Sequence, residues 1–450
     1  MDVPLEVLQH KARPAIETVT LIDEYCKLYQ DLFPEVRSFE YFKYLHLGMI
    51  SEIKRKTLPA IARAVGLEDA QGLHHFLWKS PWEVKSLKNR RLKILHKALN
   101  GASFLLCIDE TGDKKKGTTT DYVDRQYIGN LGKIENGIVS VNAYGIIEGI
   151  TFPLIFKVFK PKKRLKSEDK YKSKPQLAIE IIEELRELGF NFNLVLADSL
   201  YGESSEFIDA LHQYNINYIV AIRSNHSVLM LSGWKVRYTR WKKFDRIFSN
   251  GKSEERFIRE KIYGKRKAVR FWEITTDKIT VPENTTWYIM TDLPGDIQLS
   301  VGNTYGFRTW IEYGFKQSKD ELGWADYRVT DYQEIERWWE IIFSTYFMIS
   351  LQSEAFKKLG NHQHSNTSDQ TNSTSADAEF TDKFCLHSWW QHHETSWKST
   401  LNNLRLIIQP KIFFCLISPW LKVFHIPDLV KGFLVLIRIM NKFKPYLPDG

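Results

Sequence analysis

The chain has 450 residues, with 63 Lys and Arg against 54 Asp and Glu, a net charge of +9 and a pI near 9.0. Because domains hold roughly 100–200 residues each, this length excludes a single small module. A hydrophobic content of 43% excludes wholesale disorder. The basic balance permits a polyanionic partner without identifying one.

The cysteines and the N-terminus bear on the compartment. The four cysteines lie far apart, with no paired spacing of the kind that forms a zinc ribbon or a redox centre. The start, MDVPLEVLQHK, has no apolar run after a basic segment, so it does not have the pattern of a secretory signal. We therefore expect a cytoplasmic protein.

The first part of the chain, 1–100, has the apolar spacing of helices and carries 16 Lys and Arg against 12 Asp and Glu. This predicts a mildly basic helical domain. Within it, 57–77 has the spacing of two helices around a turn at Gly66. Such a pair contacts DNA in helix-turn-helix proteins and is also common in any helical bundle, so both interpretations stand.

The hydrophobicity pattern of the sequence changes at residue 101, where apolar and alternating runs rich in β-branched and aromatic residues begin. These runs predict strands at 104–109, 138–147, 151–159, 193–198 and 217–225. Helical periodicity predicts helices at 175–189 and 203–214. Strands that come first in series and then alternate with helices indicate an α/β mixed sheet covered by helices over 101–224.

Basic residues concentrate in the next region. From 225 to 272 the chain holds 14 Lys and Arg and 4 Asp and Glu, a local sum of +10 that exceeds the net charge of the whole chain. Strand-like runs predict a basic β-rich insert over 225–300. Helices are expected around 304–322 and 333–356, within a part of the chain that spans 301–356.

The C-terminal part begins with a polar stretch. Residues 361–382 are rich in Ser, Thr, Asn and Asp, which predicts a flexible linker over 357–382 before a helical region, 383–450. The most apolar tracts, 341–353 and 412–421, are too short or too interrupted by proline to reach the ~20 residues that span a bilayer. We expect buried helices there and no membrane partner.

Two acidic residues end predicted strands. Asp109 follows FLLCI and Asp198 follows NLVLA, so each carboxylate comes at the carboxyl end of a buried strand, where sites of α/β proteins lie. Taken singly, each is more simply explained as a turn or cap residue. The pair is more informative, because the first and fourth strands of a mixed sheet can be neighbours.

Four further side chains share one face of a predicted helix. They are Tyr305, Arg308, Glu312 and Lys319. At about 100° per residue they fall within an arc of about 60°. A carboxylate beside two cations and a phenol suits a site where a hard divalent ion meets a phosphate backbone. The alternative is an amphipathic helix with an Arg308–Glu312 pair on its solvated face, which requires neither Tyr305 nor Lys319.

On these residues the chain resembles the DDE-type transposases of insertion sequences, which have an RNase H-like catalytic core. The Y-x2-R-x3-E-x6-K signature of one branch matches Tyr305, Arg308, Glu312 and Lys319. The segment DETGDKKKG…RQYIGNLGKIENG, which begins at Asp109, also resembles the DDE superfamily endonucleases, with Glu110 where a second Asp is frequent. The resemblance covers roughly 100–356 and implies an RNase H-like mixed sheet with flanking helices, interrupted by the β-rich insert.

The resemblance also implies roles for these residues. The metal ligands would be Asp109, Asp198 and Glu312, and the phosphate contacts would be Tyr305, Arg308 and Lys319. Carboxylates without His or Cys suit Mg²⁺ or Mn²⁺ rather than zinc. Two such ions, about 3.5–4 Å apart, can activate a water or a DNA 3′-hydroxyl and stabilise the leaving oxygen.

An aromatic contact to DNA is implied as well. Transposases with this signature that process ends through hairpins hold a flipped base against a Trp of the β insert. Trp272 and Trp287 lie on strand-like runs of the insert close in sequence to the catalytic helix. Taken alone, each of the two is better explained as a core residue.

Two other groups of residues are weaker candidates for a functional site. Cys385, His387, His392 and His393 have a spacing that fits no common structural zinc site. Lys114, Lys115 and Lys116, and the run 157–174 with nine basic and two acidic residues, are either solvated loops or DNA-facing edges of the site.

The sequence is therefore interpreted as a DDE transposase that binds element ends, cleaves DNA and joins the ends to target DNA. Its expected parts are a helical DNA-end-binding domain (1–100), a split catalytic core (101–224 and 301–356), the insert (225–300), the linker (357–382) and a helical C-terminal region (383–450). Double-stranded DNA and a second copy of the chain are the expected partners. One alternative is a nuclease with the same core that cuts without joining, and another is a transposase-derived DNA-binding regulator. Strand transfer and metal-dependent cleavage, respectively, discriminate them.

Overall fold

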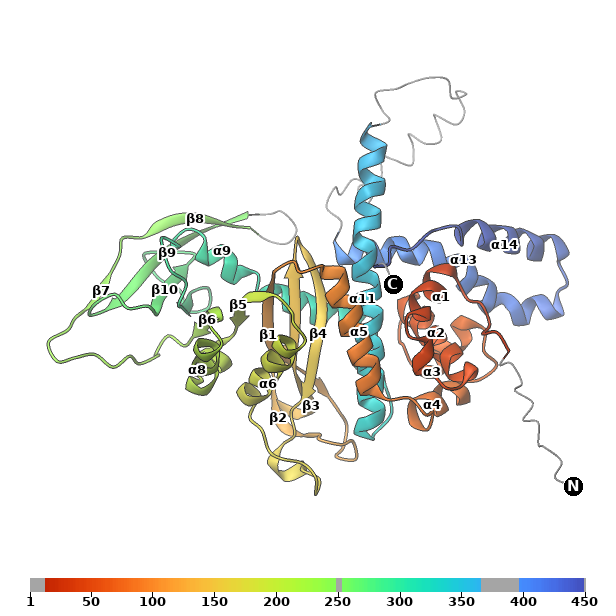
Figure 1. The fold of residues 1–450 in the computed structure, drawn as a ribbon, viewed down its shortest axis with the longest axis horizontal. Helices are drawn as coiled ribbons and strands as arrows, with labels where there is room; N and C mark the ends of the chain where they lie inside the picture. The colour runs from red at the N-terminus through yellow and green to blue at the C-terminus, as the bar shows by residue number, and fades with distance from the viewer. Residues whose placement is uncertain (1–12, 248–252, 366–395, 449–450) are drawn as a thin grey trace, which may run out of the picture. The chain divides into compact units, whose positions relative to one another are not determined.

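The computed structural model describes residues 13–247, 253–365 and 396–448. The chain divides into two compact units, each described here by itself (Figure 1). The helical unit takes in the chain up to Arg91, Glu321–Arg328 and the residues from Gln333 onward. The sheet unit takes in Leu92–Asp320 and Val329–Tyr332.

The helical unit is built around one long, buried helix. Its helices are α1 (Thr20–Lys27), α2 (Val36–Ile50), α3 (Leu58–Val65), α4 (Gln71–Trp78), the first half of α5 (Val84–Leu99), α11 (Tyr332–Ser365), α13 (Trp397–Val423) and α14 (Pro427–Met440), with a 3-10 turn at Gln30–Leu32. The side chains of Arg91 on α5 and Glu340 on α11 form an ion pair at 2.5 Å and are at most 1% exposed. Removing one partner of such a pair typically costs about 3–5 kcal/mol. The helices expected in the first hundred residues, around 333–356 and after residue 396 are confirmed.

The helix pair expected at 57–77 is present as α3 and α4. Gly66 ends α3 with φ +82°, and the next N–H, of Leu67, donates to the carbonyl of Ala62 at 2.9 Å. This left-handed cap favours glycine. α4, with the sequence QGLHHFLW, holds no Lys or Arg. DNA binding by this pair therefore stays a prediction.

The C-terminal helices depart from expectation in two ways. α11 continues to Ser365, so the stretch 357–365 is helical rather than part of a linker. α13 passes through two prolines without a break, and its tract 412–421 is partly exposed, with Phe413 and Trp420 at 47% and 46%. The prediction of a buried helix there was wrong, whereas 341–353 on α11 is buried as expected. In the described part of the chain, α13 is the one helix with the length and composition to cross a membrane, which by itself is weak evidence.

The core of the sheet unit is a mixed sheet with the strand order β4-β3-β1-β5-β6. Its strands are β1 (Phe104–Lys114), β3 (Lys133–Ile147), β4 (Ile150–Val158), β5 (Phe192–Ala197) and β6 (Asn217–Ile222). β2 (Asp124–Ile128) forms a hairpin with β3. β3 runs antiparallel to β1 and β4, and β1, β5 and β6 are parallel. The strands expected over 101–224 are all present, and the RNase H-like mixed sheet is confirmed.

The basic insert extends this sheet instead of forming a separate layer. Its strands are β7 (Val236–Tyr238), β8 (Lys242–Ile247), β9 (Ser253–Tyr263), β10 (Arg270–Thr275) and β11 (Trp287–Thr291). β11 pairs antiparallel with β6 of the core, β10 lies between β11 and β9, and β9 pairs with both β7 and β8. Figure 1 shows β7–β10 reaching beyond β6, away from β4. The β-rich insert is confirmed, and its strands are continuous with the core sheet.

Helices cover the core sheet. They are α6 (Lys174–Glu187), α7 (Ser199–Gly202), α8 (Ser205–Gln213), α9 (Val301–Gly306) and α10 (Thr309–Lys316), with 3-10 turns at Gly129–Leu131 and Lys162–Arg164. α6 packs on α8 and on strands β3 and β4, and α10 packs on β1, β3 and β4. At the start of α6, the Ser173 hydroxyl accepts from the Gln176 N–H at 3.3 Å, and the Gln176 side chain accepts from the Ser173 N–H at 2.9 Å. This capping box fixes where α6 begins.

The single helix expected over 304–322 is divided. Between α9 and α10 the backbone stays right-handed helical but tightens, so that the Arg308 N–H donates to the Tyr305 carbonyl at 2.9 Å. After α10, a π turn at Gln317–Glu321 follows. A π turn holds more residues than an α turn, so a uniform 100° step does not place Lys319 on the face of Tyr305.

Candidate active site

The strand register brings Asp109 and Asp198 together. β1 and β5 are parallel, and their last paired residues are Ile108 and Ala197. The next residue of each strand is an aspartate, so both carboxylates emerge at the same carboxyl edge. Oδ1 of Asp198 accepts from the Leu200 N–H at 2.9 Å and caps α7. The expectation that the two strands are neighbours is confirmed.

Glu110 joins this pair. Carboxylate oxygens of Asp109, Glu110 and Asp198 all lie within 4.8 Å of one another. Glu110 was not among the predicted site residues, since the resemblance assigns Asp109 as the first ligand. The available signal was its place directly after Asp109, where the resemblance to DDE superfamily endonucleases implies a frequent second Asp. The cluster consists of carboxylates alone, which suits a hard divalent cation.

Glu312 reaches the cluster through Arg308. One guanidinium nitrogen of Arg308 lies 2.8 Å from Oδ2 of Asp109, and the other lies 2.7 Å from Oε1 of Glu312. The Glu312 side chain is 55% exposed, whereas that of Arg308 is 18% exposed. The predicted i,i+4 pair is therefore present, and it faces the carboxylates instead of lying on a purely solvated face.

The other two residues of the stripe are engaged elsewhere. Lys319 donates to the Gly112 carbonyl at 2.7 Å and pairs with Asp113 at 2.9 Å, and the Asp113 side chain is 4% exposed. Lys319 thus fastens the π turn to β1. Tyr305 is 6% exposed and packs edge-on against Trp287, with ring centroids 5.5 Å apart. Both side chains thus have contacts within the protein, and their contact with a DNA phosphate stays a prediction.

The two insert tryptophans differ in environment. Trp272 on β10 is 2% exposed, which supports the alternative that it is a core residue. Trp287 on β11 is partly exposed, and the guanidinium carbons of Arg246 and Arg256 each lie 4.4 Å from its ring centroid. Through Tyr305, Trp287 is connected to the helix that carries Arg308.

Burial and mutual repulsion perturb the acidic cluster. Burial, aided by the charges of Asp198 and Glu110 and opposed by the cation of Arg308, raises the pKa of Asp109 to about 8. Burial, followed by the charge of Glu110, also raises the pKa of Asp198. Burial disfavours the charged form of Arg308, yet Tyr305, Asp109 and the neighbouring Glu312 raise its pKa well above the ordinary value. A divalent cation at this cluster would relieve the repulsion between the carboxylates.

Many basic residues of the insert are paired within it. The ion pairs are Arg256–Glu254, Arg259–Glu273, Arg266–Glu260, Arg270–Glu260 and Lys243–Glu255. Among the residues that the structure describes, Lys235, Arg240, Lys242 and Lys265 have exposed side chains for which it shows no ion pair, hydrogen bond or ring contact, whereas Arg237 donates to the Gly264 carbonyl and Lys267 lies over the Trp234 ring. The charge available to a partner is therefore smaller than the local sum of +10 over 225–272 indicates.

The lysine runs of the core are largely paired too. Lys114 pairs with Glu135, and Lys157, Lys160, Lys166, Lys172 and Lys174 each pair with an acidic side chain. This favours solvated, internally paired loops over a free DNA-facing edge for most of 157–174. The possible zinc cluster at Cys385, His387, His392 and His393 lies outside the described residues.

Comparison with known proteins gives consistent matches. The DDE superfamily endonuclease family matches residues 30–232, and the transposase DDE domain family matches residues 167–348. A probable transposase for insertion sequence element IS701 of Microchaete diplosiphon is 58% identical over 325 residues, which cover 72% of this chain and 86% of the relative. Among solved structures, a piggyBac transposase synaptic complex with hairpin DNA aligns with a TM-score of 0.40 and 10% identity, over 96% of this chain and 83% of that one.

Proposed function

The chain belongs to the DDE transposases of insertion sequences, and from that membership we propose that it binds the ends of such an element, cleaves DNA there and joins the ends to target DNA. The observation that carries the proposal is the meeting of Asp109 and Asp198 at one edge of the mixed sheet, with Glu312 linked to them by Arg308. Phosphoryl transfer needs little covalent chemistry from a protein, so positioning and charge stabilisation carry the catalysis.

The donor set fits the divalent metals that DDE enzymes use. Carboxylate oxygens are the ligands that Mg²⁺ and Mn²⁺ prefer, and the cluster is short of positive charge. We propose that Asp109, Asp198 and Glu312 hold two such ions. When bound, the ions would activate a water or a DNA 3′-hydroxyl and stabilise the leaving oxygen.

The other three side chains of the stripe, Arg308, Lys319 and Tyr305, have distinct roles in the proposal. Arg308 lies between Asp109 and Glu312 and keeps further N–H donors, so a phosphate oxygen at the site would find it within reach. Lys319 acts by fixing the π turn to β1, through Asp113. Tyr305 acts by packing against Trp287, which sets the position of α9 beside the insert.

The test is a set of carboxamide variants at the proposed ligands. Asp109→Asn, Asp198→Asn and Glu312→Gln should each abolish Mg²⁺-dependent nicking of element ends while far-UV circular dichroism and DNA retention stay near wild type. Asp209→Asn on α8, an exposed position, is the matched control and should nick normally. If Asp198→Asn nicks at the wild-type rate, the assignment is wrong. Transfer of a pre-cut end to target DNA separates this function from cleavage alone.

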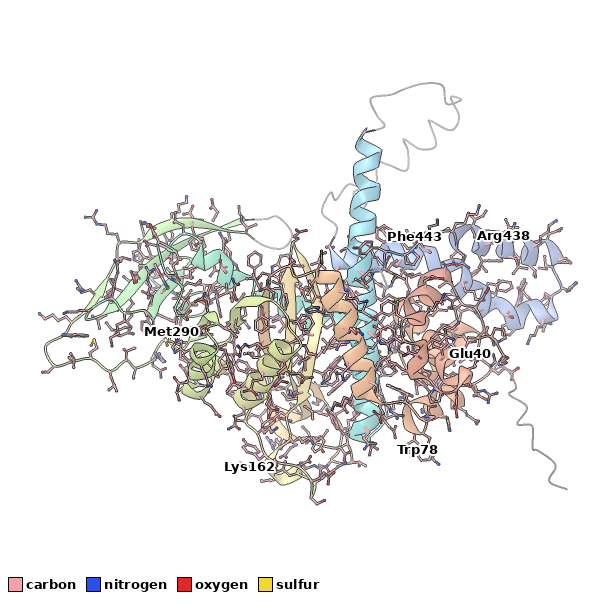
Figure 2. All side chains as sticks on the ribbon, viewed as in Figure 1. Glu40, Trp78, Lys162, Met290, Arg438 and Phe443 are labelled. Carbon is pink, nitrogen blue, oxygen red and sulfur yellow. The ribbon has the colours of Figure 1, made fainter. Side chains whose placement is uncertain are left out.

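We further propose that two copies act together in the cytoplasm, since an element has two ends to be joined. The hairpin of α13 and α14 offers a surface for a second copy, and Figure 2 shows side chains standing out along it, Arg438 among them. Its exposed apolar residues are Leu406, Phe413, Leu416, Trp420, Val423, Leu434, Val435, Leu436 and Ile439. Exposed apolar side chains of this kind mark surfaces that a protein partner can cover. Light scattering of wild type and Leu416→Glu should show a dimer and a monomer, respectively; a monomeric wild type, alone and with DNA ends, would remove the proposal.

A further inference from the structure

Glu110 departs from the usual alternation of a strand. It follows Asp109 on β1, so its side chain starts toward the opposite face of the sheet. β5 ends opposite Ile108, however, and beyond that point no strand in the described part of the chain pairs with β1 on that side. The longer Glu110 side chain reaches this open edge, where its carboxylate meets those of Asp109 and Asp198 within 4.8 Å.

Two donors hold the Glu110 carboxylate in place. Nζ of Lys174 donates to Oε1 at 2.9 Å, and the hydroxyl of Tyr201 donates to Oε2 at 3.1 Å. Tyr201 is fully buried, and the Lys174 and Glu110 side chains are 17% and 15% exposed. Lys174 is the first residue of α6, whose start is fixed by its capping box. Each carboxylate oxygen has two acceptor sites, so both oxygens can still bind a cation.

We propose that Glu110 is a fourth carboxylate of the metal centre and that Lys174 and Tyr201 are its positioning residues. This rests on the proposed function and adds to it a ligand outside the expected set of three. Hard divalent cations hold oxygen ligands at about 2.0–2.6 Å, so ligands of one such cation lie at most about 4–5 Å apart. The carboxylate oxygens of Glu110 and the two aspartates all lie within 4.8 Å of one another. Glu312 is not part of that cluster and is 55% exposed.

Charge supports the same assignment. Four carboxylates face two cations, Arg308 and Lys174, which leaves the centre short of the charge of one divalent ion. A purely structural salt bridge between Lys174 and Glu110 is the rival explanation. The two explanations predict different effects of removing Glu110 on the metal-free protein. If Glu110 is only a salt-bridge partner, its removal lowers the stability, whereas removal of a metal ligand from a cluster of mutually repelling carboxylates does not.

The experiment compares Glu110→Gln with Lys174→Met in the full-length protein. Binding of Mn²⁺ is followed by the electron paramagnetic resonance of the free ion, and thermal unfolding is measured without metal. Glu110→Gln should weaken Mn²⁺ binding at least tenfold and leave the metal-free Tm unchanged or higher. Lys174→Met should lower the metal-free Tm, because it leaves the Glu110 charge without its cation. Tyr201→Phe should weaken Mn²⁺ binding by a smaller factor, about two- to fivefold, because the Glu110 carboxylate then loses only one of its two donors.

The controls separate failure of this inference from failure of the proposed function. Glu187→Gln, an exposed position at the end of α6, makes the same charge change and should bind Mn²⁺ as wild type does. If Glu110→Gln binds Mn²⁺ normally while Asp109→Asn does not, Glu110 is structural and only this inference fails. If Asp109→Asn also binds normally, the proposed metal centre itself is wrong. Equal losses of metal-free Tm in Glu110→Gln and Lys174→Met would likewise establish the salt bridge.

Discussion

The exposed, unpaired basic residues of the insert provide a direct test of DNA contact. Lys235, Arg240, Lys242 and Lys265 are exposed, and the described structure shows no ion pair, hydrogen bond or ring contact for their side chains, whereas most other basic side chains of 225–272 make such contacts within the insert. We expect these four to bind DNA phosphates. Replacing all four by Gln removes the contacts without leaving a buried carboxylate unpaired, so the fold should be retained.

The magnitude follows from counterion release. Each phosphate contact contributes about 0.9 to the slope of log K against log[salt], so four lost contacts should flatten the slope by about 3.6. Between about 50 and 200 mM salt, wild type should then lose about 150-fold more affinity than the variant. Sequence preference should change little, because phosphate contacts carry no direct sequence information. The measurement is fluorescence anisotropy with labelled element ends and with unrelated duplexes over a salt series.

A charge-neutral variant supplies the control. Lys243→Gln combined with Glu255→Gln removes an exposed ion pair of the same insert and leaves its net charge unchanged, so the slope should equal that of wild type. A slope in the fourfold variant that differs from wild type by less than about 0.9 would mean that these side chains are merely solvated. A change of sequence preference without a change of slope would also contradict the reasoning.

Further predictions concern the two tryptophans of the insert and the buried Lys56. Trp287→Ala should slow end processing on paired DNA about ten- to a hundredfold, because stacking one base contributes about 1–3 kcal/mol, and the defect should be much smaller on ends whose flipped base is already unpaired. Trp272→Ala, at a 2% exposed position, should instead lower stability and slow processing of both substrates equally. Equal defects of Trp287→Ala on both substrates would show that Trp287 too only packs the insert. Burial lowers the pKa of Lys56 from 10.5 to about 7 in the folded protein. Between pH 7 and 10.5 the unfolded chain therefore binds more protons than the folded one, so the free energy of unfolding rises with pH across that range. Lys56→Met should remove this rise, measured as the difference in urea midpoint between pH 7 and pH 10, and a variant that keeps the full rise would refute the assignment to Lys56.

The sheet could be predicted because its strands are continuous apolar runs bounded by polar residues. FLLCI before Asp109 and NLVLA before Asp198 each predicted a buried strand with a carboxylate at its end, and the parallel pairing of β1 with β5 placed the two ends side by side. The continuity of the insert with the core sheet could not be predicted. It depends on the pairing of β11 with β6, a contact between residues about seventy positions apart that leaves no local periodicity.

The site was only partly predictable, for reasons of local geometry. Helical periodicity correctly brought Arg308 and Glu312 together, because the two lie one turn apart. The period does not extend unbroken to Lys319, since the π turn interrupts it, and there an ion pair with Asp113 holds the side chain on β1. Glu110 was not predicted as a site residue, since its approach to the aspartates depends on where β5 ends, which the sequence does not show.

Among the carboxylates of the site, Glu312 has the most exposed side chain, and this has a consequence for how the site is assembled. Its side chain is 55% exposed, and its ion pair is with Arg308, which also binds Asp109. The link between the helix carboxylate and the strand carboxylates is therefore electrostatic, through one guanidinium. A phosphate oxygen would compete for the same N–H donors, since guanidinium binds carboxylate and phosphate in the same geometry. A DNA phosphate at Arg308 would therefore compete with Glu312 for the guanidinium, and binding of the substrate would be coupled to the arrangement of the carboxylates through this side chain.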